Sequence, residues 1–70
     1  MFRINIPSSE LKSVGYDSSK MILEIELLPA GIIQYLKVPE KVYAGLLNAK
    51  SYRSYFINKI KYIYPCQRIE

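Results

Sequence analysis

Apolar and polar residues alternate along the first half of the chain, a pattern that is typical of strands with one buried face. The clearest case is residues 21–28, where leucine or isoleucine alternates with Glu24 and Glu26. Residues 11–17 precede it and residues 31–38 follow it, separated by short stretches of turn-forming residues. We therefore predict an antiparallel three-stranded meander.

A shorter alternation near the N-terminus raises the alternative of a fourth strand. Phe2, Ile4 and Ile6 alternate with polar residues, and Pro7 ends the pattern because proline lacks the backbone N–H that strand pairing uses. The sheet is therefore predicted to have three strands, or four in this alternative.

The spacing of apolar residues changes to a helical period in the second half of the chain. Proline suits the first helical position, so a helix is predicted to begin at Pro39 and to end near residues 48–49. Ser51 can cap a second helix, predicted to run through Tyr62 and to stop ahead of Pro65. Each helix has one apolar side, and we expect both to cover the same face of the sheet.

The second predicted helix has two chemically different sides. The apolar side, which we expect to pack on the sheet, comprises Tyr52, Tyr55, Phe56, Ile60 and Ile63. The opposite side comprises Lys50, Arg53, Ser54, Ile57 and Lys61. Lys59 falls in the middle of the apolar side, where it either snorkels to solvent or marks the edge of a cleft.

Length and composition limit the chain to a single domain. We predict one α+β domain over residues 1–70, an antiparallel meander of three (or four) strands with two helices packed on one face. The one cysteine, Cys66, and the lack of histidine exclude an intrachain disulfide and argue against a zinc site, so no metal or cofactor is predicted. The longest uncharged stretch has ten residues, too few to cross a membrane, and a small domain without disulfides fits a cytoplasmic location.

Positive charge is concentrated in the last part of the chain. Residues 1–40 hold four basic and five acidic side chains, whereas residues 41–70 hold six basic and one acidic, giving balances of −1 and +5. A polyanion such as RNA would therefore be attracted mainly to the second part. The ordinary alternative is that these charges only keep the outer side of a helix in solvent.

Basic and aromatic side chains together form the candidate nucleic-acid site. Phosphate contacts are predicted at Lys50, Arg53, Lys61 and Arg68. Base stacking is predicted at Tyr35, Tyr62 or Tyr64. Tyrosines at helical spacing are more often part of a core, which is the competing interpretation. The leading hypothesis is a noncatalytic module that binds RNA.

Two other classes of function compete with RNA binding. Ile57 lies among the basic residues, so an interaction with another protein, or with a second copy of the chain, is the alternative. Catalysis is not expected, because Glu24 and Glu26 fit a solvated sheet face and Cys66 has no histidine partner. No small-molecule substrate is indicated.

Taken in order, short segments of the chain resemble the KTSC domain, a bacterial module found alone or at the C-terminus of some lysyl-tRNA synthetases. The matching segments are Ser13-Val14-Gly15-Tyr16-Asp17, Leu23-Glu24-Ile25-Glu26-Leu27, Gly31, Tyr35, Val38-Pro39, Val42-Tyr43, Leu46-Leu47, Ser51, Tyr55-Phe56, Ile60, Tyr64-Pro65 and Arg68. They cover roughly residues 8–69. The resemblance implies a fold of this class and, through the synthetase fusion, RNA as a partner.

The chain departs from the family pattern at three positions. Ile33 stands where the family has the first tyrosine of a Tyr-x-Tyr motif. Arg53 replaces a glycine and Ile57 replaces an asparagine. A ligand contact made by the missing tyrosine or asparagine in relatives would be lost in this chain.

Overall fold

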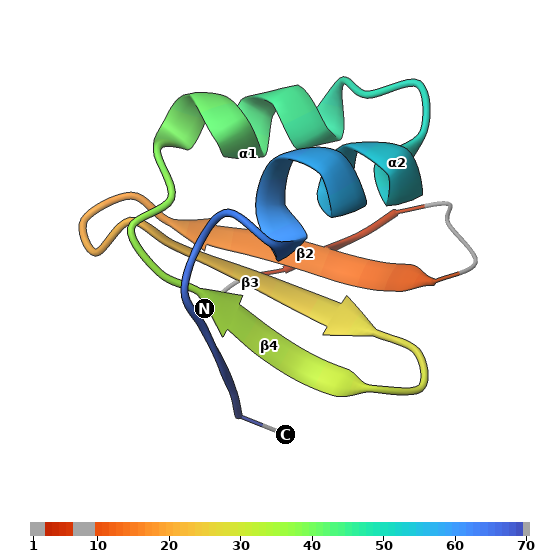
Figure 1. Ribbon diagram of the computed structural model, residues 1–70, viewed down its shortest axis with the longest axis horizontal. Coiled ribbons are helices and arrows are strands. Elements are labelled where there is room, and N and C mark those ends of the chain that lie inside the picture. The colour runs from red at the N-terminus through yellow and green to blue at the C-terminus, as the bar shows by residue number, and fades with distance from the viewer. Residues whose placement is uncertain (1–2, 7–9, 70) are drawn as a thin grey trace.

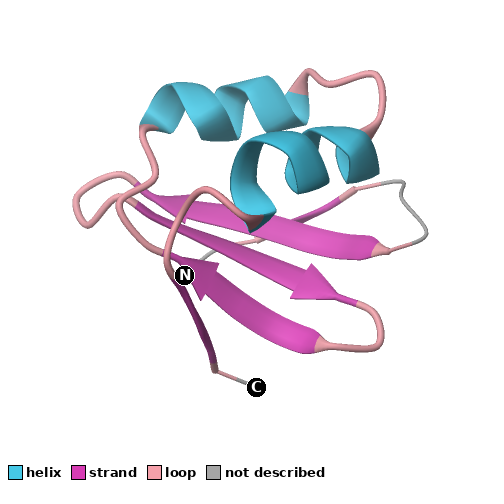
Figure 2. Cartoon of the chain, viewed as in Figure 1, coloured by secondary structure: helices cyan, strands magenta, loops and turns pink. Residues whose placement is uncertain are grey.

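The computed structural model describes residues 3–6 and 10–69 of the 70-residue chain. In this part of the chain, one antiparallel sheet is covered on one face by a layer of helices (Figures 1 and 2). The elements are β1 (Ile4–Asn5), β2 (Leu11–Asp17), β3 (Ile22–Leu27), β4 (Gly31–Tyr35), α1 (Glu40–Leu47), α2 (Tyr52–Phe56), the π-helix η1 (Ile57–Lys61) and β5 (Cys66–Arg68). The predicted α+β class, with helices on one face of an antiparallel sheet, is confirmed. None of the helices described is long and apolar enough to cross a membrane.

The number of strands differs from the prediction. The described residues form a sheet of five strands in the order β1-β2-β3-β4-β5, not of three or four. After Pro65 the chain returns to the sheet, and β5 pairs with β4 so that Cys66 lies opposite Tyr35. The three residues of β5 are all exposed, so their polarity shows no period of two and gives no strand signal in the sequence.

Strand β1 corresponds to the fourth strand of the alternative prediction. It pairs with β2 in antiparallel register, with Ile4 opposite Val14. Phe2 and Pro7, which belonged to the same predicted pattern, lie outside the described residues.

The core lies between the sheet and the helical layer. In β3, Leu23 and Ile25 join the core, and Glu24 between them contacts Arg3 and Gln34 instead, as the period of two predicted. The buried apolar residues of the core are Ile6, Leu11, Val14, Leu23, Ile25, Tyr35, Val38, Leu46, Phe56 and Ile60. Strands and helices therefore meet through one continuous apolar layer, whereas the other face of the sheet carries polar side chains together with Ile22 and Ile32.

The second helix is not a continuous α-helix. α2 ends at Phe56 and the chain continues as η1, whose turns hold more residues than α-helical turns, so later side chains are rotated from their α-helical directions. Ile57, predicted to be exposed, is half-buried and packs against the core. Ile63, predicted to pack on the sheet, follows the end of η1 and is 59% exposed. Both predictions were wrong. Ile57 keeps the α-helical hydrogen bond from its N–H to the carbonyl oxygen of Arg53, so the core extends further around the helix than the predicted apolar side, whereas Ile63 lies beyond the last helical residue.

The two helices approach each other closely at Gly45. The hydroxyl of Tyr55 donates a hydrogen bond to the carbonyl oxygen of Val42 at 3.1 Å. A Cβ atom at position 45 would lie 2.2 Å from that hydroxyl oxygen and 2.8 Å from the ring carbon that bears it. The absence of a side chain at Gly45 is what allows Tyr55 to reach α1.

Replacing Gly45 by alanine is expected to lower the free energy of unfolding by about 1 kcal/mol. The lost hydrogen bond and the displacement of Tyr55 together cost roughly 2 kcal/mol, more than the gain in helix propensity of about 1 kcal/mol. Urea denaturation measures the change, with Ala44→Gly as the control for helix propensity alone. A Gly45→Ala variant that is more stable than the unaltered protein would contradict this account.

Candidate functional site

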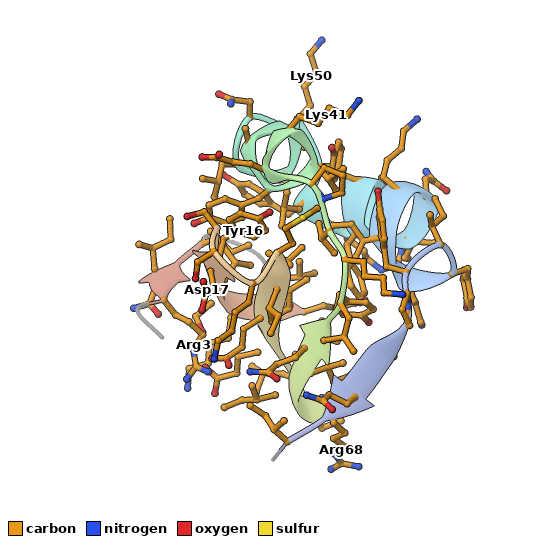
Figure 3. All side chains as sticks on the ribbon, turned by 90° about the vertical axis from the view of Figure 1, so that its left-hand side faces the viewer. Arg3, Tyr16, Asp17, Lys41, Lys50 and Arg68 are labelled. Atoms are coloured by element: carbon orange, nitrogen blue, oxygen red, sulfur yellow. The ribbon has the colours of Figure 1, made fainter. Side chains whose placement is uncertain are left out.

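The four predicted phosphate-binding residues lie in two parts of the fold. Lys50 is exposed in the connection between α1 and α2, Arg53 is on α2, and Lys61 is the last residue of η1. Arg68 lies on β5 at the edge of the sheet. Figure 3 shows Lys50 and Arg68 at opposite ends of the molecule. The structure therefore does not bring all four cations onto one surface.

Arg53 forms an ion pair with an acidic residue. Its Nε atom donates to Oε1 of Glu10 at 2.6 Å, and the two side chains are 58% and 46% exposed. At this exposure the pair contributes little to stability, but the carboxylate offsets the charge that a phosphate would meet. Arg53 is therefore a weaker candidate for phosphate contact than Lys50 or Lys61.

The three candidate tyrosines have different environments. Tyr35 is only 2% exposed, and its ring makes an edge-to-face contact with Phe56 at 5.6 Å between centroids. Burial raises the pKa of its hydroxyl to about 12. Tyr35 is a core residue, so its prediction as a stacking partner was wrong. Tyr64 is half-buried against the core, whereas Tyr62 is 78% exposed.

The exposed ring of Tyr62 lies beside a lysine. The Nζ atom of Lys61 is 5.4 Å from the centroid of the Tyr62 ring, within the range of a cation–π contact. Tyr62 follows the last residue of η1, so the helix end fixes the backbone from which the ring projects. The Lys61–Tyr62 pair is thus an aromatic face and a positive charge presented together to solvent.

Lys59 lines a surface hollow instead of entering the core. It is exposed, and the hollow, of about 390 Å³, is also lined by Lys50, Ser54, Tyr55 and Asn58. We call this 390 Å³ surface hollow the lysine hollow. Of the two interpretations of Lys59 from the sequence, the structure supports the cleft edge. Lys59 follows Tyr55 by four positions and Ser51 by eight, so all three line the hollow from one side of the helix.

The sheet face opposite the helices carries a row of polar residues. Glu24 lies opposite Gly15 on one side and Gln34 on the other, and Gln34 lies opposite Gln67. Continuing the pairing of β1 with β2 by one residue places Arg3 opposite Gly15. We call Arg3, Gly15, Glu24, Gln34 and Gln67 the polar row, and it crosses all five strands.

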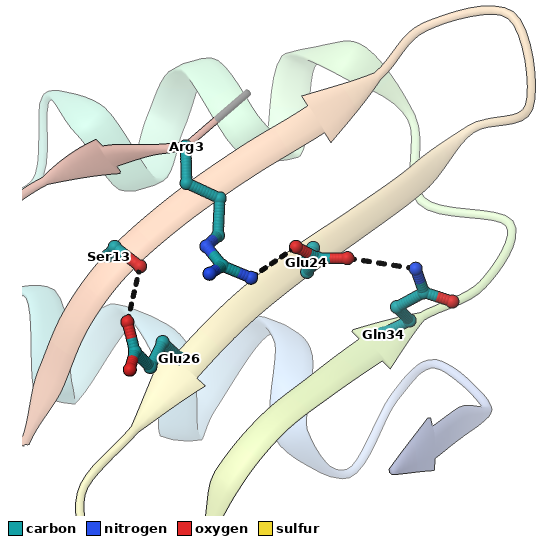
Figure 4. A network of polar contacts seen from close by, with 5 residues as sticks. All are labelled: Arg3, Ser13, Glu24, Glu26 and Gln34. Atoms are coloured by element: carbon teal, nitrogen blue, oxygen red, sulfur yellow. Dashed lines mark hydrogen bonds and ion pairs between the residues drawn. The ribbon is translucent and has the colours of Figure 1, made fainter. Parts of the chain in front are cut away.

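Hydrogen bonds connect the side chains of the polar row. Arg3 reaches across β2 to form an ion pair with Oε2 of Glu24, as Figure 4 shows. Gln34 donates to Oε1 of Glu24 at 2.9 Å, and Gln67 donates to Oε1 of Gln34 at 2.9 Å. Gly15 has no side chain, which leaves the path of Arg3 over β2 open.

Glu24 differs from the sequence prediction. It was expected on a solvated sheet face, but it is only 5% exposed. Arg3 on one side and Gln34 on the other cover it, and each donates to one of its two carboxylate oxygens. Glu26, its partner in the prediction, is half-buried and accepts a hydrogen bond from Ser13 at 3.0 Å. The two carboxylates are held in separate structural contacts and do not act on a common point.

The segment Ser13–Asp17 also has a structural role. Tyr16 stacks on Tyr43 of α1 with ring centroids 5.2 Å apart, and its hydroxyl donates to the carbonyl oxygen of Val38. Asp17 caps the turn that follows it by accepting hydrogen bonds, and the Ser19 hydroxyl donates one of them at 2.7 Å. These hydrogen bonds, chiefly the one from Ser19, lower the pKa of the Asp17 carboxyl group. These side chains, labelled in part in Figure 3, tie the start of α1 and the β2–β3 turn to the sheet.

A second, wider hollow of about 680 Å³ lies beside the polar row. Its lining includes Asp17, Lys20, Ile22, Glu24 and Gln67. Within the described ranges, no three Asp, Glu, Cys or His side chains gather where they could hold a metal ion. The acidic groups of this hollow, Asp17 and Glu24, are already engaged by neighbouring donors.

Sequence reasoning missed the lysine hollow as a unit and the polar row. The only signal for the hollow was the misplaced Lys59 on an otherwise apolar helix side. For the row, the signals were a glycine inside a strand, Gly15, and polar residues at positions 24 and 34. The row became recognisable only when the strand register was known.

Comparison with known proteins agrees with the fold and the segments described above. The family model of the KTSC domain, which describes the sequences of its members, matches residues 7–64. An uncharacterised protein from Stutzerimonas stutzeri is 39% identical over 56 residues, which cover 80% of this chain and 79% of that protein. The crystal structure of a KTSC domain protein from Yersinia pestis is 35% identical and superimposes with a TM-score of 0.96, covering 99% of this chain and 97% of that one. The resemblance inferred from the sequence is thereby confirmed, and the chain belongs to the KTSC domain family.

Proposed function

We propose that this protein is a noncatalytic module that binds single-stranded RNA through the end of its helical layer. The observation that carries the proposal is the Lys61–Tyr62 pair, an aromatic ring that is 78% exposed with an ammonium group 5.4 Å from its centroid. Stacking of one base on such a ring contributes about 1–3 kcal/mol, and the neighbouring cation attracts the phosphate that follows the base. We also propose a cytoplasmic location, where RNA partners are present.

The surrounding charge supports this site. Lys50 and Lys59 are exposed on the same helical layer, and both line the lysine hollow. Arg53 contributes less because Glu10 offsets its charge, and Arg68 lies apart on β5. With few phosphate contacts, binding is expected to be weak and strongly dependent on salt. Beside a synthetase domain, such a module would act by raising the local concentration of tRNA.

Replacing Tyr62 by alanine is expected to weaken RNA binding by about tenfold, since each stacked base contributes about 1–3 kcal/mol. Replacing Lys61 by alanine should instead lower the slope of log affinity against log salt by about 0.7, the value for one phosphate contact on a single strand. Fluorescence anisotropy with a labelled oligouridylate at several salt concentrations measures both effects.

Lys12→Ala provides the matched control, because Lys12 is an exposed lysine that belongs to strand β2 and not to the helices. Lys12→Ala should leave unchanged both the affinity for oligouridylate and the loss of affinity caused by Tyr62→Ala. Equal loss of binding in Lys12→Ala and Lys61→Ala would indicate that only net charge matters. Oligouridylate that shows no binding to the unaltered protein, or binding that does not depend on Tyr62, would refute the proposed site.

Self-association is the second candidate function, and the structure changes the residue on which it depends. Ile57, its basis in the sequence, is half-buried against the core and offers little surface to a partner. Ile63 is 59% exposed next to Tyr62 and takes its place. Light scattering at the concentrations of the RNA titration distinguishes the two candidates, since a monomer under those conditions removes self-association.

A further inference from the structure

The lysine hollow has features of a built ligand site. It lies between the α1–α2 connection and the outer side of α2 and η1, and its volume of about 390 Å³ is within the range of small-ligand pockets, roughly 300–1,000 Å³. Two of its lining residues, Lys50 and Lys59, are cationic, and none of its lining residues is acidic. The surface of the hollow is mostly apolar, and the charge of its two lysines therefore favours an anion over a cation.

The remaining lining residues add an apolar floor and hydrogen-bonding groups. Ala49 and the ring of Tyr55 are half-buried, and the hydrogen bond from the Tyr55 hydroxyl to Val42 at 3.1 Å holds the ring in place. Ser54 and Asn58 are exposed and lie on the same side. An aromatic surface beside two ammonium groups matches a ligand that combines a flat ring with a negative charge.

Lys59 reaches the hollow from the side of the second helix that also carries Ser51 and Tyr55. Ser51 and Tyr55 precede Lys59 by eight and four positions, a spacing that places all three along one side of a helix. Ile60, the next residue, is fully buried, so the backbone from which Lys59 projects is anchored in the core. The hollow is therefore built on a packed helix and not on a loop alone.

We propose that the lysine hollow binds one nucleotide of a single-stranded nucleic acid. The base packs against the ring of Tyr55 and the methyl group of Ala49, and the phosphate is held between Lys50 and Lys59. This inference rests on the proposed RNA-binding function and adds a second contact to the Lys61–Tyr62 pair. Because a base must leave its stack to enter, the hollow selects single strands over duplexes.

A titration with mononucleotides tests the hollow directly. Uridine 5′-monophosphate is expected to shift the amide resonances of Ala49, Ser54 and Asn58 with an affinity of about 1 mM, typical of a weak site. Uridine alone and inorganic phosphate alone should each bind at least about tenfold more weakly, since each offers only one half of the ligand. Phosphate that reproduces the shifts at the same concentration would overturn the proposal of a nucleotide site.

Ser54→Glu places a carboxylate in the hollow and should abolish the shifts caused by the mononucleotide. Ser18→Glu, at an exposed position in the β2–β3 turn, is the matched control and should leave them intact. Lys50→Gln and Lys59→Gln provide a second test that does not add a charge, and each should weaken binding about fivefold or more. Mononucleotide shifts that persist in all three hollow variants would overturn the proposal.

The outcomes separate this inference from the proposed function. If oligouridylate binds in a manner that depends on Tyr62 but Ser54→Glu retains full affinity, RNA binding stands and the nucleotide hollow is refuted. If the mononucleotide binds in a manner that depends on Ser54 and the lysines while oligouridylate does not bind at all, RNA binding is refuted and the hollow stands only as a site for a free nucleotide.

Discussion

Replacing Phe56 by alanine is expected to lower the free energy of unfolding by about 3–5 kcal/mol, the usual cost of emptying a large aromatic site in a core. Phe56 is 3% exposed and is the last residue of α2. Its ring makes an edge-to-face contact with Tyr35 of the sheet, with centroids 5.6 Å apart. It therefore links the helical layer to the sheet at the point where the α-helix changes to a π-helix.

The effect is large relative to the whole domain. A chain of 70 residues has a free energy of unfolding of roughly 4–10 kcal/mol, at about 0.05–0.15 kcal/mol per residue. The Phe56→Ala variant is therefore expected to be partly unfolded at room temperature or to melt well below the unaltered protein. Urea denaturation monitored by circular dichroism measures the change.

Two controls define what this measurement means. Phe56→Leu keeps most of the apolar volume and should cost less than half as much as Phe56→Ala. Tyr62→Ala removes an aromatic ring of similar size from the surface and should change stability by less than about 0.5 kcal/mol. A Phe56→Ala variant as stable as the Tyr62→Ala variant would show that the helical layer is not held at this contact.

Replacing Arg3 by methionine is expected to lower the free energy of unfolding by about 2–3 kcal/mol. The change leaves the carboxylate of Glu24, whose side chain is 7% exposed, without its cationic partner on the polar row. Removing one member of a fully buried ion pair costs about 3–5 kcal/mol, and the 27% exposure of the Arg3 side chain reduces this value. Urea denaturation again provides the measurement.

A double-mutant cycle separates the pair from the loss of arginine itself. Glu24→Leu removes the carboxylate that Arg3→Met would leave unpaired, so the double variant should recover most of the stability lost in Arg3→Met alone. The coupling between the two positions is expected to be about 1–3 kcal/mol. Losses that simply add in the double variant would mean that the ion pair has no role in holding β1 to the sheet.

Local patterns in the sequence were sufficient for most elements. The alternation of residues 21–28 placed β3 with the correct side toward the core, and the turn residues on either side placed β2 and β4. Pro39 and Ser51 marked where the two helices begin. These predictions succeeded because a strand or helix with one buried side must repeat apolar residues at its own period.

The same reasoning failed where the spacing of apolar residues did not match a regular helix or strand. Ile57 packs against the core although it lies outside the predicted apolar side, and Ile63 lies beyond the helix in solvent. β5 has no buried side chain, so nothing in its composition distinguishes it from a loop. Two of the seven predicted site residues also proved to be misplaced, since Arg68 lies at the sheet edge and Tyr35 is buried.

By itself, the sequence determined the fold class, the order of the three central strands, the two helices and the family, because each depends on neighbours within a few positions. Only the tertiary structure decided which distant residues meet. Arg3 and Glu24 are 21 positions apart and Gln34 and Gln67 are 33 apart, and their contacts follow from strand register, not from any local pattern. The lysine hollow likewise joins Lys50 of the α1–α2 connection to Tyr55 and Lys59 of the second helix, an arrangement set by the packing of the two helices. A side chain's environment depends on the packing of whole elements, and that packing is a property of the assembled chain.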